Sequence, residues 1–229
     1  GAASFNLFVY YRRDGHIFWS DSNAIGRYDP DGGDAIDAAF QALTFTDITQ
    51  GIVHSKDDRL YVGYYNNAGA AGAKSFIASK NGTAAWSTTA LTLPDHLVPT
   101  SLSEYGNFLA IVCTPANGIE NSRLFLWDRN ESTTTLAESI DLGSGSAIIT
   151  EELDGELIII SQNGGTGASF TNNPVGTINH RDRVTFRRLV GNVAVKFLEL
   201  RANHSGSANT TQIPLYKQKI DNRLYFQML

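Results

Sequence analysis

The feature that most constrains the fold is a three-part pattern that returns at nearly constant spacing. An apolar-containing segment, a short turn and a strongly apolar segment follow one another around Asp57, Gly106 and Asp154. These turn residues lie 49 and 48 residues apart. The first two units continue with a third and a fourth apolar segment, "SFIAS" and "ALTL" in one and "RLFLWD" and "SIDL" in the other. A fixed period in this range indicates a repeat architecture, here with four short strands in each unit.

Four antiparallel strands in roughly 40–50 residues are typical of a β-propeller blade. The second segments, "RLYVGYY", "NFLAIVCT" and "ELIIISQ", are apolar almost throughout, as expected for strands covered on both faces by neighbouring blades. We therefore predict an all-β fold, a β-propeller of four-stranded antiparallel blades of about 48 residues each. Clear blades are expected at 48–97, 98–146 and 147–180, and irregular blades at 1–47 and 181–229.

Four to five such blades fit in 229 residues. An open ring exposes strand edges, so we expect the chain to be part of a ring completed by residues before Gly1, after Leu229, or both. One segment leaves its type open. "GGDAIDAAFQAL" (Gly32–Leu43) fits either one short helix or a loop that leads into a strand.

Three resemblances support the same fold. "GHIFWSDSNAIGRYDPDGG" resembles a blade of the YWTD type, in which the matching places are taken by Trp19, Asp21, Arg27, Asp29 and Gly32. "SKNGTAAW" resembles a degenerate Asp-box of sialidase-like propellers, with Ser79 and Trp86 in place, Asn81 for the Asp and Gly82 one place early. More broadly, the Gly/Asn/Thr-rich blades look similar to propeller-bearing virion proteins of bacteriophages. These resemblances imply a propeller and identify no chemistry.

Charge is unevenly spread along the chain. Residues 1–175 carry 9 Lys and Arg against 20 Asp and Glu, whereas residues 176–229 carry 9 against 3. In the basic part, alternation in "RVTFRRLV" predicts a strand with Val184, Phe186 and Arg188 on one face and Thr185, Arg187 and Leu189 on the other. Either this segment contacts a protein partner, or it packs on the acidic part of the chain. Nucleic acid is not expected, because its binding calls for a broader basic surface with stacking aromatics.

Partner contact is also expected from aromatic side chains in Tyr-, Trp- and Asn-rich loops. The full set of predicted partner-binding residues is Arg181, Arg183, Arg187, Arg188, Tyr64, Tyr65 and Trp86.

Support for a cofactor is confined to one loop. "DPDGGD" offers Asp29, Asp31 and Asp34, oxygen ligands of the kind that Ca²⁺ takes, although turn chemistry explains the same residues. The histidines are never paired with Cys or Asp at metal-ligand spacing. Glu151 and Glu152 adjoin on a strand and so point to opposite faces, which prevents them from flanking one bond. We predict no catalytic residues and no cofactor other than Ca²⁺.

No apolar run approaches the roughly 20 residues of a membrane-spanning helix, so no membrane insertion is expected. The single cysteine, Cys113, lies within "FLAIVC" and is expected to be a small buried hydrophobic residue.

The sequence favours a non-enzymatic structural or binding module of a larger extracellular or virion assembly, such as a phage tail. Its expected partners are other protein subunits, with a surface receptor or glycan as a further candidate. The alternative is a carbohydrate-active, sialidase-like propeller enzyme whose acid and nucleophile project into the central channel. Fold alone does not choose between these functions.

Overall fold

The computed structural model describes most of the chain, and every regular element in the described residues is a β-strand. The described residues are 7–21, 24–43, 47–65, 74–116, 121–132, 136–143, 146–163, 177–178, 183–201, 211–212, 216–220 and 223–227.

Sixteen of the strands form four antiparallel four-stranded sheets. Blade 1 holds β1 (Phe8–Tyr11), β2 (His16–Asp21), β3 (Ala24–Asp29) and β4 (Ala35–Ala42). Blade 2 holds β5 (Asp47–His54), β6 (Arg59–Tyr65), β7 (Ser75–Lys80) and β8 (Ser87–Thr92). Blade 3 holds β9 (Leu97–Tyr105), β10 (Phe108–Pro115), β11 (Ser122–Trp127) and β12 (Leu136–Gly143). Blade 4 holds β13 (Ser146–Leu153), β14 (Glu156–Asn163), β16 (Arg183–Val190) and β17 (Val193–Arg201).

Two smaller antiparallel sheets complete the described strands. One pairs β15 (Thr177–Ile178) with β18 (Thr211–Gln212), and the other pairs β19 (Tyr216–Ile220) with β20 (Arg223–Gln227). The predicted all-β fold with four-stranded antiparallel sheets is confirmed.

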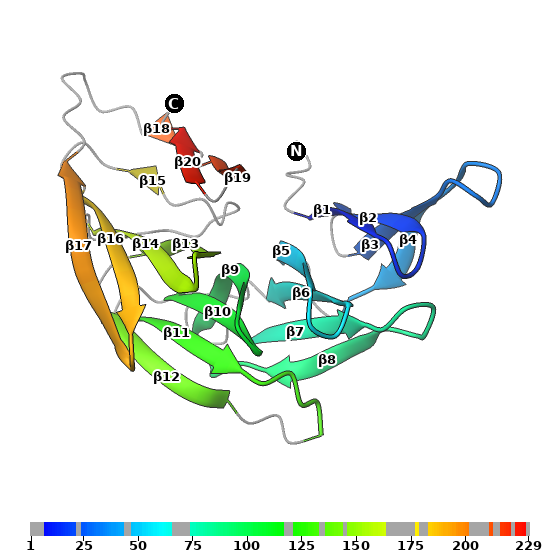
Figure 1. The fold of residues 1–229 in the computed structure, drawn as a ribbon. Helices are drawn as coiled ribbons and strands as arrows, with labels where there is room; N and C mark the ends of the chain where they lie inside the picture. Colours follow the sequence, from blue (N-terminus) through cyan, green and yellow to red (C-terminus); the bar gives the residue numbers. More distant parts are fainter. Residues whose placement is uncertain are drawn as a thin grey trace.

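The four blades stand side by side in an arc, with the first strand of each blade innermost and the fourth outermost (Figure 1). The inner strands touch one another around the arc, because β9 contacts both β5 and β13, and β5 contacts β1. This is the arrangement of blades in a β-propeller.

Blade 4 extends beyond residue 180, where the sequence pattern places a border, because the strand that pairs with β14 begins only at Arg183. The segment Gly32–Leu43, expected to be one short helix or a loop that leads into a strand, consists of the end of a turn followed by β4. Its residues pair with β3, as Tyr28 does with Ile36, and these cross-strand contacts outweigh a weak helical periodicity.

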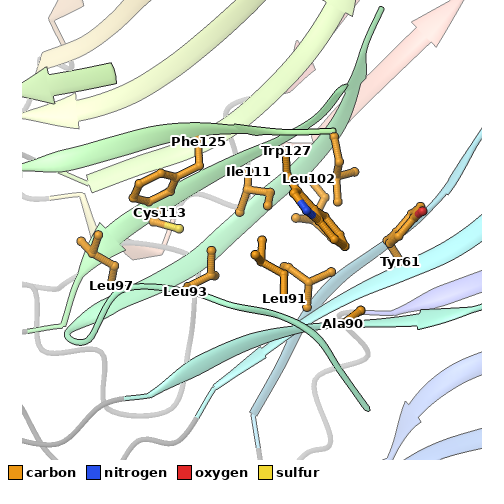
Figure 2. Close-up of a cluster of buried hydrophobic side chains, with 12 residues drawn as sticks. Tyr61, Ala90, Leu91, Leu93, Leu97, Leu102, Ile111, Cys113, Phe125 and Trp127 are labelled. Carbon is orange, nitrogen blue, oxygen red and sulfur yellow. The ribbon is translucent and has the colours of Figure 1, made fainter. Parts of the chain in front are cut away.

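The hydrophobic core lies between the blades, one cluster to each interface. The cluster between blades 2 and 3 includes Tyr61, Leu91, Ile111 and Trp127 (Figure 2). Two others fill the interfaces between blades 1 and 2 and between blades 3 and 4. Successive residues of β10 enter different clusters, since Ile111 faces blade 2 and Val112 faces blade 4. The second strands of blades 2 and 3, β6 and β10, are therefore apolar almost throughout because each contributes to two cores.

Cys113 lies in this core and is fully buried. Burial raises the pKa of its thiol far above the ordinary value, so the thiol stays neutral and unreactive at neutral pH. We expect a maleimide to leave the native protein unmodified and to react fully in denaturant, as measured by intact-mass spectrometry. Rapid labelling of the native protein would contradict the burial of Cys113.

Candidate interaction surface at the blade turns

The turns between the first and second strands and between the third and fourth strands lie at the same end of each blade, because all strands are antiparallel neighbours. In blades 1 to 3 these turns are residues 12–15, 30–34, 55–58, 81–86, 106–107 and 128–135, and we call their described part the turn face. Ion pairs and hydrogen bonds join the turns of one blade to those of the next.

A buried ion pair joins blades 1 and 2. Lys80 Nζ lies 3.3 Å from Asp14 Oδ2, and the two side chains are only 3% and 5% exposed. Lys80 Nζ also donates to the Ala84 carbonyl at 3.0 Å. His16 lies beside this pair, with Nε2 3.2 Å from Asp29 and Nδ1 3.2 Å from Asp14, the second contact without hydrogen-bond geometry. Lys80 thus holds the Asp14 carboxylate of blade 1 against blade 2, and His16 lies between the carboxylates of Asp14 and Asp29 within blade 1.

The Tyr11 hydroxyl crosses the same interface. It donates to the Asp58 carbonyl at 2.7 Å and accepts from the Gly82 amide at 2.7 Å. Burial raises the pKa of Tyr11, so its hydroxyl remains a donor. The last side chain of β1 is therefore fastened to two turns of blade 2.

A second charged cluster joins blades 2 and 3. Asp57 Oδ2 accepts from the Tyr61 hydroxyl at 2.7 Å and lies 2.7 Å from Arg129 Nη1. Burial, followed by the bond to Asp57, raises the pKa of Tyr61 well above its usual range. Next to this cluster, Arg59 Nη1 lies 3.0 Å from Glu131 Oε1. Four charged side chains from two blades thus neutralise one another in pairs.

His54, the last residue of β5, forms a hydrogen bond with the next blade as Tyr11, the last residue of β1, does. Its Nε2 donates to the Phe108 carbonyl at 3.0 Å, and its Nδ1 accepts from the Lys56 amide at 3.2 Å. In blades 1 and 2, the last residue of the first strand therefore forms a side-chain hydrogen bond with the next blade. The turn aspartates, Asp14 and Asp57, repeat as well, since each pairs with a cation of the following blade.

The sequence analysis marked Asp57 as a turn residue of the repeat, but it missed Lys80 and Arg129, the cations that pair with Asp14 and Asp57. Each of these cations lies at or just after the end of a third strand, which is the signal that could have identified them.

The predicted calcium ligands lie in the turn between β3 and β4. Asp29 Oδ1 accepts from the Gly32 amide at 2.8 Å and the Asp31 amide at 3.1 Å. The first of these bonds is the main reason why the pKa of Asp29 is lowered. Asp34 accepts from the Tyr28 hydroxyl. The turn thus already engages Asp29 and Asp34, and within the described ranges no three His, Cys, Asp or Glu side chains are grouped to hold a metal ion. Calcium binding stays a prediction.

The predicted partner-binding residues are divided among different places. Trp86 lies on the turn face, where its ring contacts Phe18 edge-on at 5.7 Å between centroids. Tyr64 and Tyr65 are buried in β6, so they are core residues here and present no contact surface.

The arginines of β16 lie on opposite faces of blade 4, as the alternation predicts. Arg188 is exposed and lies 3.4 Å from Glu156. Arg187 points toward blade 3 and donates to Ser161, and burial lowers its pKa. Arg183 is described only as backbone of β16, and Arg181 lies outside the described residues.

Comparison with known proteins establishes the fold only. No protein-family model matches the chain, and no curated protein matches it. The N-terminal domain of Nup159 is similar at 11% identity and a TM-score of 0.55, over 95% of this chain and 54% of that one. A chain of the COPII outer coat vertex on membranes is similar at 10% identity and a TM-score of 0.58, over 100% and 57%. A chain in the S. cerevisiae complex of Dbp5 with Nup159 is similar at 12% identity and a TM-score of 0.51, over 90% and 50%.

These likenesses, together with the arc of four blades, define the chain as a β-propeller structure. It spans about half the length of the structures it matches. In the part of the chain that is described, no helix is long and apolar enough to cross a membrane.

Proposed function

We propose that this chain is a non-enzymatic binding module of a multi-protein assembly, extracellular or on a virion, and that the turn face contacts the partner protein. The observation that carries the proposal is the linkage of neighbouring turns by the Asp14–Lys80 and Asp57–Arg129 pairs. A surface whose side chains are already fixed loses little conformational entropy on binding.

The same linkage weighs against catalysis. A glycosidase needs one carboxyl group poised as an acid and a second as a base or nucleophile. On the turn face, Asp57 and Glu131 are paired with arginines. The Glu104 carboxylate, near the end of β9, accepts from the Ser55 amide and hydroxyl of the turn face at 2.6 Å each. These groups stabilise the joints between blades.

The structures with a similar fold also favour an assembly. One belongs to a coat on membranes and another to a complex of several proteins. A role within a larger assembly is what we propose for this chain.

Site-specific photo-crosslinking tests the proposal. Lys56 is exposed on the turn face, and Thr89 is exposed on the outer strand of blade 2. Benzoylphenylalanine at position 56 should yield a covalent adduct with another protein in the native source, and the same group at position 89 should not. The proposal fails if position 56 gives no adduct beyond that of position 89, or if the purified protein hydrolyses a glycan.

A further inference from the structure

Arg27 is a partly exposed cation that no described carboxylate neutralises. It lies on β3 beside Phe18 of β2, and its cross-strand neighbour on β4 is Asp37. Asp37 Oδ1 accepts from the Ala39 amide at 3.2 Å, and the two side chains form no ion pair. Among the described residues the Arg27 guanidinium makes no hydrogen bond, and its Nε is buried without a partner. A buried donor in this state calls for an explanation, and an anionic ligand is one that suits a guanidinium.

Aromatic rings fix the position of the Arg27 guanidinium. Its Cζ lies 4.1 Å from the centroid of the Phe40 ring, which is a cation–π contact. The Phe40 ring contacts that of Phe18 at 6.1 Å between centroids, and Trp86 contacts Phe18 edge-on at 5.7 Å. We call Phe18, Arg27, Phe40 and Trp86 the aromatic cluster. A guanidinium that stacks on a ring keeps its planar edge available for two parallel hydrogen bonds to a carboxylate.

The aromatic cluster lies where the joint between blades 1 and 2 meets the turn face. Phe18 is fully buried, whereas Arg27, Phe40 and Trp86 are each partly exposed. Trp86 directly precedes β8, and its indole Nε1 is a second buried donor without a partner among the described residues. Two unpaired donors, one from each blade, therefore belong to a cluster that is partly open to solvent.

The charges at this joint favour an anion. Arg13 is exposed, and its Nε lies 3.4 Å from the position that a Cβ would take at Gly82, in the same turn as Trp86. Within the described ranges Arg13 forms no ion pair, although it donates to the Asp57 carbonyl at 3.4 Å. Arg13 and Arg27 are thus two positive charges without a carboxylate partner, and an acidic side chain of another protein is complementary to them.

A carboxylate fits this joint better than a phosphate group. The carboxylates of Asp14 and Asp29 each lie 3.2 Å from His16, whose ring contacts that of Phe18 at 6.2 Å between centroids. These two negative charges repel a dianionic phosphate more strongly than a carboxylate of single charge.

We propose that the aromatic cluster binds the side-chain carboxylate of an Asp or Glu residue of the partner protein, and that Arg27 is the residue that recognises it. The carboxylate accepts two hydrogen bonds from the Arg27 guanidinium. The exposed parts of the Phe40 and Trp86 rings contact the aliphatic stem of the acidic residue. This inference rests on the proposed function, because it assigns an acidic anchor to the protein that contacts the turn face.

Titration of the natural polypeptide with two blocked amino acids tests the inference. The probe is N-acetylglutamate N-methylamide, and the neutral control is N-acetylglutamine N-methylamide, which has nearly the same shape. Binding is followed by NMR through the indole N–H signals of Trp19, Trp86 and Trp127, and Trp86→Phe identifies the signal of Trp86. Trp127 is the internal control, because it is fully buried between blades 2 and 3.

The expected result is a saturable shift of the Trp86 signal with the glutamate probe, with a Kd in the millimolar range, and no shift with the glutamine control. Arg27→Gln should raise this Kd at least about tenfold, because it removes the charge and the paired hydrogen bonds. Arg27→Lys keeps the charge without the planar fork and should raise the Kd about threefold, which provides a second readout if Arg27→Gln perturbs folding. Arg188→Gln, at an exposed position of blade 4, should leave the Kd unchanged.

The absence of any shift at about 100 mM probe would overturn the inference. Equal shifts with both blocked amino acids, an unchanged Kd in Arg27→Gln, or tighter binding of inorganic phosphate than of the glutamate probe would overturn it as well. The titration needs no partner protein, so the two proposals can fail separately. Saturable binding without a crosslink at position 56 would refute contact through the turn face, whereas a crosslink without binding of the probe would refute the carboxylate site.

Discussion

Replacing Trp127 by alanine is expected to lower the free energy of unfolding by about 3–5 kcal/mol, the usual cost of removing a large buried aromatic side chain. Trp127 is 0% exposed, and its ring contacts Tyr61 of blade 2 edge-on at 5.7 Å between centroids (Figure 2). The substitution leaves a cavity in the core between blades 2 and 3, to which residues of both sheets contribute. Urea unfolding followed by circular dichroism measures the loss.

Two further variants test whether the cavity between the blades causes the loss of stability in Trp127→Ala. The indole Nε1 of Trp127 has no hydrogen-bond partner among the described residues, so Trp127→Phe breaks no hydrogen bond and should cost about half as much or less. Trp86→Ala removes the same type of side chain from a partly exposed position and should cost less than Trp127→Ala. If both tryptophan-to-alanine variants lost the same stability, the inter-blade cavity would not be the cause.

Replacing Lys80 by methionine should cost a similar amount, about 3–5 kcal/mol, because it leaves the Asp14 carboxylate buried without its cation. Methionine keeps most of the aliphatic volume of lysine, so the loss reports on charge rather than on packing. Thermal unfolding should show a decrease in Tm of roughly 10 °C. Asp14→Asn tests the same pair from the other side, since it leaves the Lys80 ammonium buried alone.

The double variant separates the stability that the ion pair contributes from the cost of burying a single unpaired charge. Lys80→Met combined with Asp14→Asn removes both charges, and we expect it to cost less than the sum of the two single changes. Arg188→Ala is the matched control, because the Arg188–Glu156 pair is exposed, with side chains 48% and 53% accessible, and should contribute at most about 1 kcal/mol. A loss for Lys80→Met no greater than that for Arg188→Ala would show that the buried pair does not hold the blades together.

The sequence was most informative for strands that are buried on both faces. The apolar runs in β6 and β10 each supply two inter-blade cores at once, and the run in β14 is buried on both faces, so all three lack the alternation of a half-exposed strand and could be recognised directly. The faces of β16 were also predictable, because a period of two places Arg187 and Arg188 on opposite sides whatever surrounds them.

The candidate surface was less predictable because its pairs join different repeats. Asp57 stood out in the sequence as a turn residue, but nothing near it pointed to Arg129, which the stacking of blade 3 on blade 2 places 2.7 Å away. Tyr64 and Tyr65 had the composition of contact residues and instead fill the core, because both faces of β6 are covered.

By itself, the sequence determined the repeat, the strands of blades 2 and 3 and their antiparallel order, since these follow from short-range hydrophobic pattern and turn residues. The tertiary structure alone decided which charges pair across blades, that β4 is a strand rather than a helix, and that the third strand of blade 4 lies after a long connection. Each of these depends on contacts between segments far apart in the chain, which local pattern does not encode.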